Sequence, residues 1–441
     1  MILKFKKVDD KLKYHEILLK NQKWKYSAPF PSDDYWQNLD EDEDEQAEKF
    51  LKQSKTCTEV MRYGSSTNGE IRIDNGMTYH RKILSHWKEF ASALEQYQYH
   101  LQISDYDGES TLTFNDIVLS TEVINLLSKA LKSTYFHGFI CQNNELDQNG
   151  IKFALDYLKK NRICKQFALH RNSMNKQDIN QLCQIVKKHP SIEILGLCGC
   201  IDEDMDGHKM LKQIITAGRN KLEVIDLADN NINTRGDTFT FIPDFLGENP
   251  ILESLDLTDN ELDDDDAILV ATSLNHNTKL RSLKMDGNNI TGVGWEALSK
   301  AVFDKTSLNS AADSNHTCNI DFPLNLKYDL VREINGEESS EHYYDPDYVR
   351  KKKIYNVLSA RNRSRSIVDH FDEDMPVELL PGMLMSIQKY ADYHVLDETD
   401  TDEDKEATPP QDIRDVKPVS IMFEILQRWD KSLAVFESLS S

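Results

Sequence analysis

The stretch LEVIDLADNNI, Leu222–Ile232, returns in altered form as LESLDLTDNEL, Leu252–Leu262. In both copies apolar side chains occupy the first, fourth and sixth positions, and an asparagine occupies the ninth. Apolar residues at alternate positions are typical of a short strand with one buried face. Because the whole pattern recurs at a fixed interval, it predicts an architecture built from repeated units.

The pattern continues on both sides of this pair, and its copies begin 28 or 30 residues apart, at Phe136, Cys164, Ile192, Leu222, Leu252 and Leu280. Their ninth positions are Asn144, Asn172, Cys200, Asn230, Asn260 and Asn288. A buried amide both donates and accepts, so it can satisfy backbone groups where the chain leaves the strand. After each strand, apolar residues three and four apart predict a helix, as in GIKFALDYLKK, Gly150–Lys160.

These copies resemble leucine-rich repeats, and their period is similar to that of the longer, ribonuclease-inhibitor-like class. The resemblance covers residues 110–320. It implies an α/β fold, namely a leucine-rich-repeat solenoid (horseshoe) with a concave parallel sheet, convex helices and helical flanking caps. Outside the repeats, HWKEF at His86–Phe90, SNHTC at Ser314–Cys318 and KKKIYNVLSARNR at Lys351–Arg363 resemble uncharacterised leucine-rich-repeat proteins of unicellular algae. That wider resemblance carries no assigned activity.

The chain outside the repeats is expected to form caps and acidic connecting segments. A solenoid needs caps over its terminal repeats, and acidic runs without apolar periodicity are typical of disorder. We therefore expect a partly disordered N-terminal segment at 1–55 with an acidic run at 40–48, an N-terminal helical cap at 56–109, the solenoid at 110–320, a C-terminal helical cap with a basic helix at 321–396, an acidic disordered linker at 397–418 and a C-terminal amphipathic helix at 419–441.

Composition restricts the class of partner. The chain has 441 residues and a formal net charge of −23, which argues against nucleic acid or an anionic membrane as the main partner. No apolar run is long enough to predict a membrane helix. The cysteine count of seven is odd, and the residues are scattered, which is typical of reduced thiols in a cytoplasmic or nuclear protein. The expected caps favour a monomer.

Two motifs allow more than one interpretation, namely a possible calcium-binding loop and a possible nuclear-import signal. Asp202, Asp204 and Asp206 alternate before Gly207, but the twelfth position of such a calcium loop is Gln213 instead of a bidentate glutamate. We therefore expect a helix start and no metal site. Seven basic residues fall between Arg350 and Arg365. They are typical either of a nuclear-import or phosphate-binding patch or, the interpretation we favour, of a capping helix with a solvated basic face.

The candidate binding face follows from the alternation of side chains along each strand. The third, fifth and seventh positions should face the concave side, with the eighth beside them. This predicts a partner-binding face formed by Ile140, Gln142, Gln166, His170, Arg171, Ile194, Cys198, Asp226, Asp229, Asp256, Asp259, Lys284 and Asp286. Its early repeats are mildly apolar and its later repeats are rich in carboxylates. The alternative is that aspartate is simply tolerated there because these positions lie near turns.

We find no glycine-rich phosphate loop, zinc-ligand spacing or nucleophile motif, so the sequence predicts neither an enzyme nor a cofactor. The expected function is a non-enzymatic protein–protein interaction module, or scaffold, whose protein partner carries a basic segment and one apolar anchor. The first alternative is a regulator or activator of a small GTPase, since some proteins of the ribonuclease-inhibitor-like class have that role and an acidic tail. The lowest-ranked alternative is a ubiquitin-ligase substrate adaptor, which would need an F-box-like helical segment.

Overall fold

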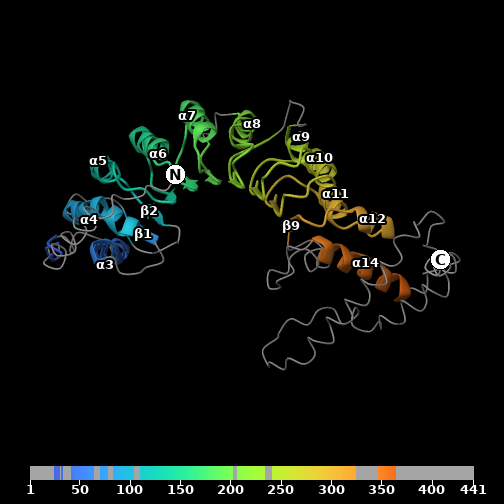
Figure 1. Cartoon of the computed structure of the whole chain (residues 1–441), viewed down its shortest axis with the longest axis horizontal. Coiled ribbons are helices and arrows are strands. Elements are labelled where there is room, and N and C mark those ends of the chain that lie inside the picture. The colour runs from blue at the N-terminus through green and yellow to red at the C-terminus, as the bar shows by residue number, and fades with distance from the viewer. Residues whose placement is uncertain are drawn as a thin grey trace, which may run out of the picture. The chain divides into compact units, whose positions relative to one another are not determined.

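The computed structural model describes residues 24–29, 31–32, 41–63, 70–77, 83–103, 110–201, 206–233, 241–323 and 346–363 (Figure 1). The chain divides into two compact units. The first comprises Met1–Asn233 and Ser254–Asn260, and the second comprises Thr234–Glu253 and Glu261–Ser441. The expected acidic linker 397–418, the expected helix 419–441 and residues 202–205 of the candidate calcium loop lie outside the described residues.

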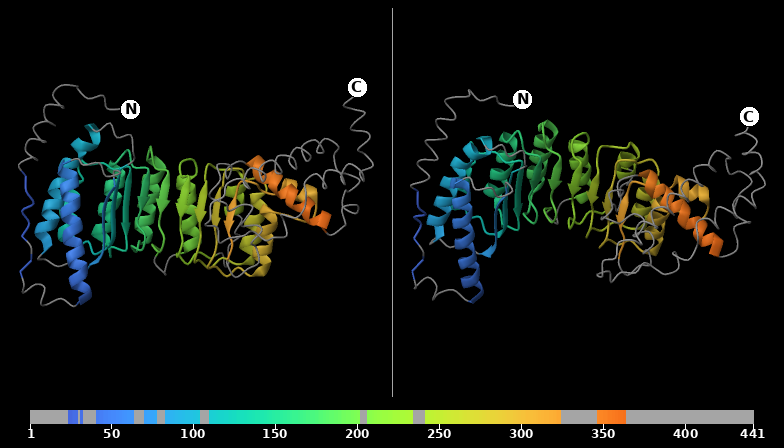
Figure 2. Two further views of the ribbon diagram at one scale, coloured as in Figure 1. Left: turned by 90° about the horizontal axis from the view of Figure 1, so that it is seen from below. Right: turned by 60° about the horizontal axis from the view of Figure 1, so that its bottom comes forward.

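The first unit is a parallel sheet with helices along one side (Figure 2). Its strands pair in chain order and are β1 (Glu70–Met77), β2 (Thr111–Ile117), β3 (Gly138–Gln142), β4 (Gln166–Ala168), β5 (Ile194–Gly196), β6 (Val224–Asp226) and β7 (Ser254–Asp256). Its described helices are α3 (Glu41–Tyr63), α4 (Leu84–Ile103), α5 (Thr121–Ala130), α6 (Gln148–Lys160), α7 (Lys176–Lys188) and α8 (Gly207–Gly218).

The second unit also combines helices with parallel strands. Its described elements are α9 (Phe241–Gly247), α10 (Asp264–Leu274), β8 (Ser282–Lys284), α11 (Gly292–Val302), α12 (Leu308–Asp313), β9 (Asn319–Asp321) and α14 (Pro346–Arg363). Strands β8 and β9 pair in parallel. Cys318, directly before β9, is 1% exposed.

Equivalent positions of successive repeats stack on one another. In the first unit the paired residues Gly138, Gln166, Ile194, Val224 and Ser254 hold the same position in each strand. The inward side chains between them are buried: Phe139, Phe167, Leu195, Ile225 and Leu255 are each at most 2% exposed. No repeat can bury such a strand alone, so the stack is the unit that folds.

The ninth-position asparagines form the predicted hydrogen-bonded ladder. The Asn230 amide oxygen accepts from the N–H groups of Cys200 (2.9 Å) and Ile201 (3.0 Å), and its amide nitrogen donates to the carbonyls of Leu197 (2.8 Å) and Ala228 (2.9 Å). Cys200, the exception in this column, uses its thiol to donate to the carbonyl of Leu169. Asn172, Asn260 and Asn288 likewise bond to backbone groups of their own repeat and of the preceding one. The Asn144 amide nitrogen donates to the Ile117 carbonyl, and its buried oxygen has no hydrogen-bond partner among the described residues.

The N-terminal part differs from the expectation in two respects. The acidic run at 40–48, expected to be disordered, contributes residues 41–48 to helix α3. Between the charged residues of α3, buried side chains recur at helical spacing. They include Ala47, Phe50 and Met61, each 0% exposed. The region 56–109, expected to be a helical cap, also contains strand β1, in which Ile71 and Ile73 are buried. The sheet of the first unit therefore begins before residue 110.

A strap of residues 24–29 packs across α3 and α4. The Arg62 guanidinium lies 4.6 Å from the centre of the Trp24 ring, and the Tyr63 hydroxyl donates to the Trp24 carbonyl at 3.0 Å. His86, on α4, holds the strap at two atoms. Its Nε2 donates to the Pro29 carbonyl (3.1 Å), so in the neutral ring its Nδ1 accepts from the Tyr26 hydroxyl (2.7 Å).

This geometry predicts that acid weakens the strap. Burial lowers the pKa of His86, against smaller raising effects from Pro29 and Glu89. The folded protein therefore favours the neutral ring, and this contribution to stability is complete above the ordinary pKa near 6.5 and is lost as pH falls below it. Between pH 7.5 and 5.5 the urea midpoint of the native chain should fall more than that of His86→Gln, which cannot titrate. Equal pH dependence of the two proteins would contradict this.

Candidate protein-binding face

The open side of the sheet in the first unit is formed by alternate residues of its strands, as the sequence predicts. Among the predicted face residues, Ile140, Gln142, Gln166, His170, Ile194, Cys198, Asp226 and Asp256 are half-buried, and Arg171, Asp229 and Asp259 are exposed. Smaller residues at the same positions are buried, namely Gly138, Ala168 and Gly196. The floor is therefore shallow and mildly apolar between β3 and β5.

His170 reaches two strands along this floor because Gly196 leaves room for its ring. A Cβ atom at Gly196 would lie 2.5 Å from the His170 Cε1. The His170 Nδ1 accepts the Cys198 N–H at 3.2 Å and lies 3.8 Å from the Asp226 Oδ2. Burial lowers the pKa of His170, and the nearby Asp226 opposes this shift. Near neutral pH the ring is therefore uncharged and does not neutralise the carboxylates beside it.

Asp226 and Asp256 form the centre of the acidic part of the face. They pair directly across β6 and β7, so their backbones are about 4.8 Å apart. One oxygen of Asp226 accepts the Ala228 N–H at 3.1 Å, and one oxygen of Asp256 accepts the Thr258 N–H at 3.0 Å. These equivalent bonds fix both carboxylates in the same orientation. Like charges placed directly opposite each other on neighbouring strands are unfavourable.

Asp229 and Asp259 have a backbone reason for their position. The eighth residue of each copy is in the left-handed region, with φ values of 52° at Asn143, 52° at Arg171, 62° at Gly199, 57° at Asp229, 52° at Asp259 and 70° at Gly287. Glycine, asparagine and aspartate tolerate this conformation best. The composition of this column therefore follows partly from the turn, as the alternative interpretation of the sequence held.

Arg171 is the exception in the left-handed column. A long side chain is unfavourable there, and residues held in this region by their surroundings are often functional. A Cβ atom at Gly199 would lie 3.2 Å from the Arg171 Cγ and 3.4 Å from the Asp229 Oδ2, so both side chains flank Gly199. Arg171 therefore places a positive charge at the edge of the acidic cluster.

The chemistry of this face favours binding over covalent catalysis. Burial raises the pKa of the Cys198 thiol to about 11, with further raising effects from Asp226, Asp229 and Asp256 that exceed the opposing effect of Arg171. The thiol is therefore protonated near neutral pH and is a poor nucleophile. Within the described ranges, no group of three or more His, Cys, Asp or Glu side chains could hold a metal ion.

The remaining predicted residues belong to the second unit. Lys284 ends β8 and pairs with Asp321 of β9, and both Lys284 and Asp286 are exposed. The predicted carboxylate cluster is thus divided, with Asp226, Asp229, Asp256 and Asp259 in the first unit and Asp286 in the second.

Sequence reasoning missed one end of the face. Strand β1 adds Arg72 and Asp74, which are joined at 2.9 Å, and the Asn115 amide of β2 donates to Asp74 at 2.8 Å. The alternation in EIRID, Glu70–Asp74, was the signal that could have found this strand. Strand β1 lacks the ninth-position asparagine that marks most of the other copies.

Known proteins are similar to parts of this chain. A family model described as Leucine Rich repeat matches residues 248–271 and 276–299. A curated relative, the protein phosphatase 1 regulatory subunit 37 homolog of Caenorhabditis elegans, is 22% identical over 222 residues, which is 48% of this chain and 23% of that protein. The alignment thus spans less than a quarter of the relative's length. An internalin of Listeria monocytogenes has a TM-score of 0.29 and 12% identity, over 55% of this chain and 68% of that one.

No helix in the described part of the chain has the length and apolar character needed to cross a membrane.

The matched repeats lie in register with the copies traced from the sequence. Together with the parallel strands and the ladder of buried asparagines, they show that this chain is a leucine-rich-repeat protein.

Proposed function

We propose that the open face of the first unit binds a segment of a protein partner that carries a basic side chain, and that the chain acts as a non-enzymatic interaction module. The observation that carries the proposal is the pair Asp226 and Asp256, in register on neighbouring strands. A cationic side chain placed between these two carboxylates would be attracted by both.

The rest of the face supplies a site for an apolar anchor. Ile140, Ile194 and Val224 lie half-buried along the floor, and the buried Ala168 and Gly196 keep it shallow. From β3 to β7 the strand spacing gives a length of about 19 Å, which about six extended residues would cross. The proposed ligand is therefore a short segment with an apolar residue over β3–β5 and a lysine or arginine over β6–β7.

The curated relative supports a protein as the class of partner. It is a protein phosphatase 1 regulatory subunit homolog, and a regulatory subunit acts by contacting another protein. The identity of the partner is not carried over from it. Small-GTPase regulation and ubiquitin-ligase adaptation gain no residue-level support from this face. The face itself favours binding, because Cys198 keeps its proton and His170 already accepts a backbone N–H.

The proposal is tested by selecting peptides from a random library on the immobilised full chain. The selected peptides should be enriched in lysine or arginine a few residues from one apolar residue. Asp226→Lys with Asp256→Lys should abolish their binding, since each exchange reverses the local field, and binding to the native chain should weaken as salt rises.

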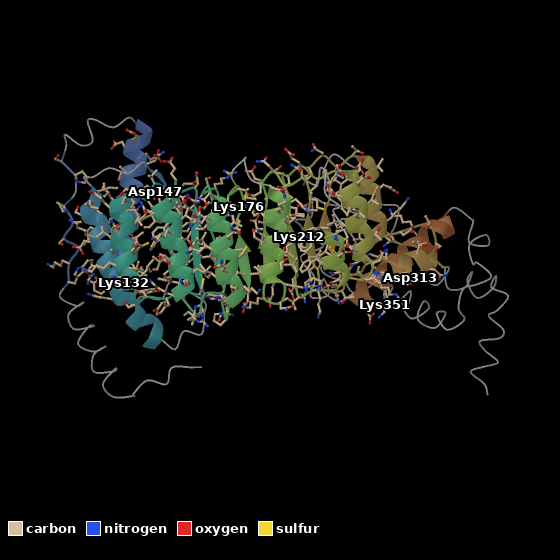
Figure 3. The ribbon with its side chains drawn as sticks, turned by 90° about the horizontal axis from the view of Figure 1, so that it is seen from above. Lys132, Asp147, Lys176, Lys212, Asp313 and Lys351 are labelled. Atoms are coloured by element: carbon tan, nitrogen blue, oxygen red, sulfur yellow. The ribbon has the colours of Figure 1, made fainter. Side chains whose placement is uncertain are left out.

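The matched control carries Glu95→Lys and Asp156→Lys, which change the net charge equally on α4 and α6. Figure 3 shows the helical side of the protein, where Lys132, Asp147, Lys176 and Lys212 mix both signs of charge. The control should bind like the native chain. If both variants lose binding equally, only net charge matters. If neither does, or no basic peptides are selected, the acidic face is not the binding site.

A further inference from the structure

The basic tract Arg350–Lys353 lies on α14 and is largely hidden. Lys352 is 5% exposed and Lys353 is 0% exposed. Val349, Ile354 and Val357, on the same helix, are 6%, 8% and 4% exposed. The expectation of a solvated basic face is therefore wrong for Lys352 and Lys353. The expectation of a packed helix agrees with the structure.

The hidden cations donate to carbonyls at the ends of neighbouring helices. The Lys353 ammonium donates to the carbonyl of Val302, the last residue of α11, and to that of Asn315 at 2.7 Å. The Arg350 Nε donates to the Ala312 carbonyl, in the last turn of α12, at 3.1 Å. The last carbonyls of a helix lack partners within the helix and carry the negative end of its dipole. Cations are therefore the appropriate donors at these sites.

This arrangement is costly for Lys353. Burial lowers the pKa of its ammonium to about 7, and Cys318 opposes the shift only weakly. The neighbouring His316 is also affected by these cations: burial, then Lys353 and Arg350, lower its pKa to about 4. With His316 uncharged and the Cys318 thiol protonated, the two carbonyls are the main compensation for the buried charge. Docking of α14 thus disfavours the charged form of Lys353, because it takes the ammonium out of water.

We propose that docking of α14 hides a nuclear-import signal, and that the tract becomes readable only when α14 leaves its position. Runs of arginine and lysine serve as import signals because a receptor contacts their charged ends in an acidic groove. A receptor cannot reach a fully buried Lys353 whose donors are directed at Val302 and Asn315. The docked helix and the bound receptor therefore exclude each other. Figure 3 labels Lys351, on this helix, and Asp313, at the end of α12.

The test compares nuclear and cytoplasmic fluorescence of the full chain fused to a fluorescent protein in eukaryotic cells. Val349→Asp with Val357→Asp places two charges in the buried face of α14 and should undock it while keeping the tract. The nuclear-to-cytoplasmic ratio should rise severalfold. Adding Arg350→Ser, Lys351→Ser, Lys352→Ser and Lys353→Ser to the undocked variant should return the ratio to that of the native chain.

The matched control is Ile268→Asp with Val293→Asp, which adds the same charges at residues that are 39% and 64% exposed. It should leave the ratio unchanged. Hydrogen exchange on the purified proteins should show lost protection in α14 only for the undocked variant. An unchanged ratio despite this lost protection would overturn the proposal.

A second arm does not depend on undocking. In the otherwise native chain, Lys351→Gln with Lys352→Gln should leave the ratio unchanged, because the tract is already hidden. A clear fall in the ratio, with α14 still protected from exchange, would show that the docked tract is read and would equally overturn the proposal.

Discussion

Replacing Asn230 by alanine should lower the free energy of unfolding of the first unit by about 3–5 kcal/mol. The Asn230 side chain makes four hydrogen bonds to backbone groups of two successive repeats, and the residue is 1% exposed. Alanine would leave the N–H groups of Cys200 and Ile201 and the carbonyl of Leu197 without these partners, whereas the Ala228 carbonyl would still accept the Gly199 N–H. Each such group costs about 1–3 kcal/mol when water cannot reach it, and partial relaxation keeps the total below the sum.

The measurement is urea unfolding of the full chain followed by circular dichroism, with hydrogen exchange to locate the loss in β5 and β6. Asn149→Ala is the matched control, since Asn149 is exposed on α6, and it should change stability by less than about 0.5 kcal/mol. Asn230→Cys should lose less than Asn230→Ala, because Cys200 occupies the same column and its thiol donates to Leu169. If alanine and cysteine behaved alike and like the control, the ladder would not hold the repeats together.

The repeated core could be predicted from the sequence because every repeat must bury the same strand positions and satisfy the same backbone groups. The first, fourth and sixth positions of a copy must be apolar and the ninth must satisfy backbone groups, so both constraints appear as columns. Even the irregular member, Cys200, was interpretable, because a thiol supplies a weak donor. The open side of each strand was equally predictable from alternation, and Ile140, Asp226 and Asp256 lie on it.

The sequence alone does not show whether backbone conformation or side-chain chemistry determines the residue at a given position. Asp229 and Asp226 look alike in the sequence, but Asp229 occupies a left-handed position at φ 57° whereas Asp226 is on a strand. Their carboxylates therefore carry different weight in an argument about a ligand. Similarly, the amino-acid sequence of α14 does not show that Lys353 is buried, because the carbonyls that accept its hydrogen bonds lie 38 and 51 residues away in the chain.

The two incorrect expectations for the N-terminal part, at residues 40–48 and 56–109, have a related cause. In α3 the charges between residues 41 and 49 dominate the composition, whereas the buried positions are only every third or fourth residue. Strand β1 carries the alternation of a repeat strand but no ninth-position asparagine, because it begins the series and has no earlier described strand whose carbonyls that side chain would have to reach. A search for identical columns is therefore weakest at the ends of a repeat array, where fewer neighbours impose the pattern.

Trp87→Ala should lower the stability of the first unit by about 3–5 kcal/mol, because Trp87 joins the N-terminal helices to the repeats. Its ring centre lies 5.2 Å from that of Phe50 on α3, 5.7 Å from Phe90 on α4 and 6.2 Å from Phe114 on β2. All four side chains are at most 1% exposed. Removing the indole would leave a cavity where these three elements meet, and Trp87→Phe, which refills most of it, should cost about 1–2 kcal/mol.

This variant also tests whether α3, β1 and α4 together form the N-terminal cap, which the sequence places at 56–109. If they do, the loss of stability should spread into the repeats, because each repeat is stabilised mainly by its neighbours. Hydrogen exchange should then show reduced protection in β2 and β3 as well as in α4. Lost protection confined to α3 and α4, with an unchanged urea transition for the repeats, would mean that these helices form a separate folding unit. In that case the repeats would need to be stable with Phe114 of β2 uncovered, which is unfavourable because this side chain is 0% exposed in the intact protein.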